Sequence, residues 1–122
     1  MASPVTVPVG RLHKVDGISV VVAAVVVTDD DMTLHMTLQP CPESFLDWWF
    51  DPQVWRVDDG LGTPYEFTAG GSRGNDQACH ASCTWTPAPP TVAVRVTFEA
   101  RKGQAVVLSQ WASIAHYRDR AG

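Results

Sequence analysis

The sequence predicts a single all-β domain, and three features of the 122-residue chain support this prediction. Apolar and polar residues alternate in many short segments, which is typical of strands with one buried face. Clusters of glycine, proline and aspartate separate these segments and favour tight turns. No segment has the periodicity of a helix longer than two turns. The eight candidate strands over residues 1–122 have the spacing of an immunoglobulin-like antiparallel β-sandwich of about seven to eight strands.

The first three predicted strands occupy the N-terminal third of the chain. Residues 2–10 alternate, but Pro4 and Pro8 cannot donate to a ladder, so this strand belongs at a sheet edge. Residues 18–28 are apolar at nearly every position, which predicts a central strand that is covered on both faces. After an aspartate turn, a strictly alternating strand completes a hairpin and is expected to bury Met32, Leu34, Met36 and Leu38.

The later strands are separated by irregular segments. Prolines end the third strand, and residues 43–50 are compatible with a helix of at most one to two turns. A strand over residues 54–58 is expected to turn at a glycine-containing loop and to return through Tyr65 and Phe67. Residues 69–78 have the composition of a glycine-rich flexible loop. Strands over 81–86, 92–99 and 104–117 follow, and the second of these is expected to bury Val92, Val94, Val96 and Phe98.

Composition and charge exclude several classes of partner. The chain is 45% hydrophobic and 18% charged, which is typical of a globular domain. Its formal net charge of −4 provides no general attraction to nucleic acid, so we expect no nucleic-acid partner. The longest apolar run, Val20–Val27, is too short to cross a bilayer, and we expect no membrane partner. Because residues 1–10 do not resemble a secretory signal, the expected location is cytoplasmic, or secreted if a signal was removed.

Three motifs occur in order along the chain. They are VG through DG over residues 9–17, VDDGLGTPY over residues 57–65 and WTPAPP over residues 85–90. Together they resemble small actinobacterial proteins of unknown function with an immunoglobulin-like β-sandwich, in which a D-x-G-T-x-Y turn precedes a glycine-rich loop and a W-x-x-P-x-P-P strand exit. The turn departs from that pattern by one extra residue between Asp59 and Gly62, and the strand exit has one residue fewer between Trp85 and Pro87. The resemblance implies a fold and no catalytic residues, since a fold alone does not define an activity.

Aromatic residues are unusually dense around the predicted helical turns. Four of them are candidates for a ligand-binding site, namely Phe45, Trp48, Trp49 and Trp55. Large aromatic side chains mostly serve burial, so closure of the core at one end of the sandwich is the simpler interpretation. The alternative is an exposed patch that anchors a partner or stacks on a sugar.

The three cysteines allow two further interpretations. Cys79, His80 and Cys83, with Cys41, offer thiolates and an imidazole that could hold zinc, although their spacing is not that of common zinc sites. In the predicted strand, Cys83 shares a face with Trp85, which favours a core cysteine instead. A disulfide between Cys79 and Cys83, or from either to Cys41, would require an oxidising compartment.

No catalytic constellation is visible in the sequence. The aspartates at 29–31 and 58–59 are best explained as turn formers, the four histidines are scattered, and no serine lies in a G-x-S-x-G elbow. We therefore expect a noncatalytic interaction module without a cofactor that binds a protein partner or self-associates. The alternative is a carbohydrate- or small-ligand-binding module that uses Trp48, Trp49 and Trp55.

Overall fold

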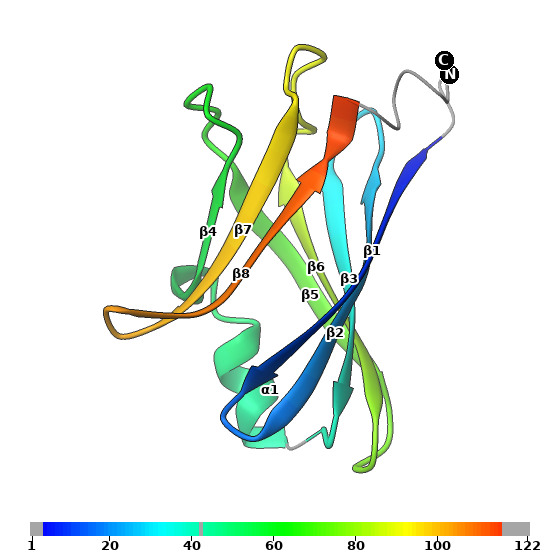
Figure 1. Ribbon diagram of the computed structural model, residues 1–122, viewed down its shortest axis with the longest axis vertical. Helices are drawn as coiled ribbons and strands as arrows, with labels where there is room; N and C mark the ends of the chain where they lie inside the picture. Colours follow the sequence, from blue (N-terminus) through cyan, green and yellow to red (C-terminus); the bar gives the residue numbers. More distant parts are fainter. Residues whose placement is uncertain (1–3, 42, 116–122) are drawn as a thin grey trace.

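The computed structural model describes residues 4–41 and 43–115, with only the backbone described for residues 43–45. Eight strands form two antiparallel sheets (Figure 1). The first sheet has the order β1 (Val5–Val15), β2 (Ile18–Val27), β3 (Met32–Gln39), β6 (Cys79–Thr86) and β5 (Glu66–Gly74). The second has the order β4 (Trp55–Asp58), β7 (Arg95–Lys102) and β8 (Ala105–Ser113). Helix α1 (Glu43–Trp49) and the 3-10 turn η1 (Pro52–Val54) connect the sheets, and the prediction of an all-β fold with one short helix is confirmed.

The strand order is that of an immunoglobulin-like sandwich. The order β2-β3-β6-β5 corresponds to strands A-B-E-D of a constant-type domain, and β4-β7-β8 corresponds to C-F-G. Strand β1 is an additional strand outside β2. On this side of the molecule, β1 and β8 run close to each other across the two sheets (Figure 1).

The core forms where the alternating strands of the two sheets face each other. The four side chains predicted to be buried on β3 are all completely buried, as the alternation of that strand requires. The facing side chains of β6, β7 and β8 belong to the same core; they include Ala81, Cys83, Trp85, Val96, Phe98 and Leu108. No helix in the described part of the chain is both long and apolar enough to span a membrane.

Two β-bulges interrupt the alternation of β1 and β2. On β2 the register shifts between Val22 and Ala24, so Val22 and Val25 are both buried although they are three positions apart. The extra residue at the bulge reverses which side chains face the core. The prediction that this strand is covered on both faces was wrong, because Val21 lies on its outer face and is 36% exposed. On β1 a shift between Pro8 and Arg11 lets the strand continue to Val15, past its predicted end. Strand β1 is an edge strand as expected, and residues 2–3 lie outside the described part.

The predicted loop over residues 69–78 was wrong for its first six residues. Strand β5 extends to Gly74 and pairs with β6 along its whole length, because backbone hydrogen bonds need no side chains. The predicted return from β4 through Tyr65 and Phe67 was also wrong. Strand β4 pairs with β7, whereas β5 belongs to the other sheet, so this connection crosses the sandwich.

The strand expected over residues 92–99 begins only at Arg95. The Ala93 N–H donates to the Pro90 carbonyl and closes a turn. Because of this turn, the side chain of Ala93 points into the core and those of its neighbours Val92 and Val94 do not. Val92 and Val94 are 73% and 65% exposed, which corrects the prediction that they line the core, whereas Val96 and Phe98 do so. Strand β8 ends at Ser113, and the end predicted at Tyr117 lies outside the described residues.

Candidate functional site

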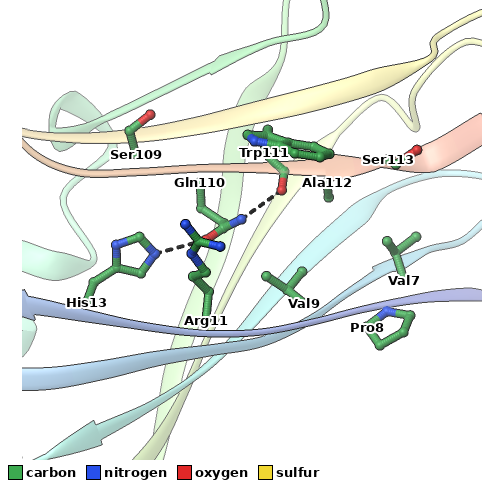
Figure 2. Close-up of a pocket in the computed structure, with 10 residues that line it drawn as sticks. All are labelled: Val7, Pro8, Val9, Arg11, His13, Ser109, Gln110, Trp111, Ala112 and Ser113. Carbon is green, nitrogen blue, oxygen red and sulfur yellow. Dashed lines mark hydrogen bonds between the residues drawn. The ribbon is translucent and has the colours of Figure 1, made fainter.

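The candidate functional site is a groove between two edge strands. Strand β1 lines it from Val7 to His13, and β8 lines it from Ser109 to Ser113 (Figure 2). Its volume is about 410 Å³. Each of the two strands has a sheet neighbour on one side only, because β1 ends the first sheet and β8 ends the second. We call this site the edge groove.

One buried amide bridges the edge groove. Figure 2 shows Gln110 reaching from β8 toward β1, where His13 Nε2 lies 2.9 Å from Gln110 Oε1 and donates to it. The amide nitrogen of Gln110 donates to the carbonyl of Trp111 at 2.8 Å. Among the described residues, Gln110 is the one polar side chain that is buried, at 8% exposure. The amide thus joins the two edges and satisfies one backbone acceptor of β8.

The contact with Gln110 also establishes which backbone groups of β8 face the groove. In an antiparallel strand, the N–H and C=O of one residue point to the same side, and successive residues alternate. Because the Trp111 carbonyl points into the groove, the backbone groups of Ser109, Trp111 and Ser113 face it as well. These groups lie on the side of β8 opposite to β7.

An exposed indole flanks the edge groove. Trp111 is 55% exposed, and the guanidinium carbon of Arg95 lies 5.7 Å from the centre of its ring, within the range of a cation–π contact. Our sequence analysis missed Trp111. The alternation along β8 could have identified it. Gln110 and Ala112 face inward, so Trp111 between them must lie on the outer face, together with the serines at 109 and 113.

The aromatic cluster predicted as a ligand site closes the core instead. Trp49 is completely buried and Trp55 is 8% exposed, so neither has a free face for a sugar. Their rings meet edge to face at 4.9 Å, and Trp55 Nε1 donates to the Trp49 carbonyl at 2.7 Å. Trp48 is half-buried against Trp49, with ring centres 5.7 Å apart. The side chain of Phe45 lies outside the described part of the chain.

The cysteines form a disulfide. Of the pairings considered, the structure contains Cys41–Cys79, with the two Cα atoms 5.7 Å apart. Cys83 is free and completely buried, and burial raises the pKa of its thiol. His80 lies on the opposite, exposed face of β6. The structure therefore does not bring Cys79, His80 and Cys83 together, and the described residues contain no cluster of three or more potential metal ligands.

Two histidines that are far apart in sequence meet on the outer face of the five-stranded sheet. His35 Nδ1 lies 3.0 Å from His80 Nε2, and the rings stack with centres 5.2 Å apart. Burial, and secondarily the charge of His80, lower the pKa of His35. Sequence analysis treated the histidines as scattered because it could not supply the register that aligns β3 with β6.

The turn that carries the family resemblance has a structural role. The carboxylate of Asp59 accepts hydrogen bonds from the Leu61 N–H at 2.7 Å, from the hydroxyl of Thr63 and from the hydroxyl of Tyr65 at 2.9 Å. Burial would raise the pKa of Asp59, but these hydrogen bonds outweigh it and lower the pKa. The D-x-G-T-x-Y residues therefore hold the β4–β5 connection in place.

The chain matches no protein-family model, no curated protein and no solved structure. The resemblance to actinobacterial immunoglobulin-like proteins stays a prediction.

Proposed function

We propose that the protein is a noncatalytic interaction module that binds an extended segment of a protein partner in the edge groove. The observation that carries this proposal is the orientation of β8, whose alternate residues direct N–H and C=O groups into the groove. An added strand satisfies such groups with main-chain hydrogen bonds, which is a recurring mode of peptide recognition. Gln110 holds one of these groups, the Trp111 carbonyl, and a sheet edge whose other backbone groups face a groove favours the same kind of pairing.

The side chains around the groove suit a peptide. Trp111 supplies a large exposed surface at the rim, and tryptophan and arginine are enriched among residues that dominate binding energy. Val7 and Val9 provide an apolar wall on the β1 side. Arg11 and His13 line the same groove, and none of its described lining residues is a carboxylate, so we expect the partner segment to carry an acidic residue.

The polar groups of the groove support binding more than catalysis. His13 donates to Gln110, and Gln110 donates to the backbone, so the imidazole has a structural partner in place of a nucleophile. A catalytic base would need to lie within hydrogen-bond reach of the group that it activates.

The disulfide bears on where the module works. Disulfides persist in oxidising compartments and are rare in the cytosol. Cys41–Cys79 therefore favours an oxidising compartment over the cytoplasmic location that the sequence suggested. The proposed module accordingly binds its partner in an oxidising compartment.

A peptide-library experiment tests strand addition. Randomised extended peptides displayed on phage are selected against the wild-type protein, and the selected peptides are titrated against Ser109→Pro and Ser109→Ala. The proline removes an N–H that faces the groove, while an edge strand tolerates proline. We expect Ser109→Ala to bind like wild type and Ser109→Pro to lose binding, with circular dichroism as the control for folding.

Two outcomes would contradict the proposal. One is a selection that yields no binding peptide, and the other is equal binding to both serine variants. Sedimentation velocity identifies the remaining case. A dimer that Ser109→Pro abolishes would make the partner strand a second copy of this chain.

A further inference from the structure

We propose that His35 and His80 form a binding site for a divalent transition-metal ion on the outer face of the five-stranded sheet. The two ring nitrogens His35 Nδ1 and His80 Nε2 converge to 3.0 Å. Either nitrogen of a neutral imidazole can ligate a metal, and imidazole suits zinc, copper and nickel. The proposal is independent of the edge groove, which lies on another side of the fold.

The spacing of the two nitrogens is close to what one ion requires. Two ligands about 2.0–2.1 Å from a tetrahedral ion lie about 3.3 Å apart. The observed separation of 3.0 Å needs to open only slightly. On binding, the proton in the present hydrogen bond moves to the remote nitrogen of the same ring, so both converging nitrogens present lone pairs.

The backbone beneath the pair is well ordered by the sheet. Strands β3 and β6 are neighbours, and each is also paired on its other side, to β2 and β5. His35 is opposite Ser82 and His80 is opposite Thr37, so the two histidines are diagonal neighbours across the ladder. Ligands on paired strands are held more accurately than ligands on loops.

The surroundings leave room for the rest of a coordination shell. A shallow depression at the pair is lined by Ser82 and by the β5 residues from Gly71 to Gly74. Gly71 is opposite Ser82, and a Cβ added there would meet nothing within 4 Å. Water can therefore complete the coordination of an ion that is held by two protein ligands.

One neighbouring charge discriminates between a cation and an anion. Arg73 is opposite His80 and lines the same depression. None of the ion pairs within the described residues includes it. Its charge disfavours a bound cation, whereas an oxyanion would use it together with the imidazoles and Ser82. Removal of this charge thus changes the two affinities in opposite directions.

Calorimetric titration of the untagged protein with Cu²⁺, Ni²⁺ and Zn²⁺ tests the site directly. We expect one site per chain with copper tighter than nickel and zinc, following the order for nitrogen ligands. His35→Ala and His80→Ala should each weaken binding by about tenfold or more, because even outer-shell changes cost 10–100-fold. Thr37→Ala is the matched control and should bind like wild type, since Thr37 lies exposed on the same face of β3, opposite His80, but carries no imidazole.

Two further variants test the geometry. Gly71→Asp places a carboxylate beside the pair, and Arg73→Gln removes the opposing charge; both should tighten metal binding. Metal should also raise the melting temperature of the wild type but not that of the double alanine variant, as expected when a ligand binds only the native state.

The proposal is overturned if the alanine variants bind metal as tightly as the wild type does. It is also overturned if the wild type binds inorganic phosphate in place of metal and Arg73→Gln abolishes that binding. The melting temperatures without metal show whether each variant is folded. The two histidines lie on the solvent face of the sheet, so their removal should leave the core intact.

Discussion

Adjacent glycines of β5 have different reasons to be glycine. A Cβ on Gly70 would lie 2.7 Å from Cδ1 of Phe50 and 3.1 Å from Cζ of Phe67, whereas Gly71 has open space on the outer face. We expect Gly70→Ala to lower the free energy of unfolding by about 1–3 kcal/mol, the usual cost of overpacking. Gly71→Ala should be neutral or slightly stabilising, because alanine loses less conformational entropy on folding. Urea denaturation of both variants measures the difference, and equal effects would contradict it.

The carboxylate of Asp59 makes the stability depend on acid. Its pKa is lower in the folded protein, so its contribution to stability is complete above the unfolded pKa and is lost as the pH falls through the folded pKa. We expect the difference in unfolding free energy between wild type and Asp59→Asn to be constant near neutral pH. It should shrink once the pH falls below the ordinary aspartate value of 3.8.

Urea denaturation of both proteins across this pH range measures the Asp59 effect. Tyr65→Phe serves as the intermediate case, because it removes one of the hydrogen bonds to the carboxylate and leaves the charge in place. A difference between wild type and Asp59→Asn that does not change with pH would contradict the role assigned to the carboxylate.

At the scale of the elements, the sequence predicts the buried face of a strand well where polar and apolar residues alternate without interruption. On β3 every second residue is polar, so the sequence identifies the buried side correctly. On β2 no polar residue follows Ser19, so nothing in the sequence reveals the bulge after Val22 or shows where the buried face changes. On β5 the glycines conceal a strand that main-chain hydrogen bonds define.

Neither candidate site could be predicted from the sequence, because each depends on strand placement. The edge groove joins His13 near the N-terminus to Gln110 near the C-terminus, and only the closure of the sandwich brings them together. The pair His35 and His80 depends on the register of β3 against β6. The aromatic cluster was visible in the sequence, but burial of Trp49 and Trp55 depends on the helix that docks them.

Trp49, the last residue of helix α1, is the residue that enters the core most deeply among the described side chains of this helix. Trp49 is completely buried and contacts Trp55, whose own ring meets Trp85 at 5.5 Å. We expect Trp49→Ala to cost about 3–5 kcal/mol of unfolding free energy, as for other buried tryptophans. Trp48→Ala should cost clearly less, because Trp48 is only half-buried. Denaturation followed by far-ultraviolet circular dichroism compares the variants, and a larger loss for Trp48→Ala would refute the assignment.

At the scale of the whole molecule, the disulfide encloses the first two of the three crossings between the sheets, from β3 to β4 and from β4 to β5. Cys41 and Cys79 are 38 positions apart in sequence. The segment between them contains α1, β4 and β5, so the chain leaves the first sheet, enters the second and returns within this loop. Closing the loop restricts the unfolded chain more than the folded one. For a loop of this length the expected stabilisation is about 4 kcal/mol.

Replacement of Cys41 and Cys79 by serine should therefore lower the free energy of unfolding by about 4 kcal/mol in urea denaturation. Reductant provides the matched control, because it should destabilise the wild type to the same level and leave the double variant unchanged. Thiol titration gives an independent check: without reductant, the unfolded wild type should expose only the thiol of Cys83, while the folded protein conceals it in the core. A wild type that is insensitive to reductant and releases three thiols on unfolding would show that the bond does not form, and it would remove the reason to place the protein in an oxidising compartment.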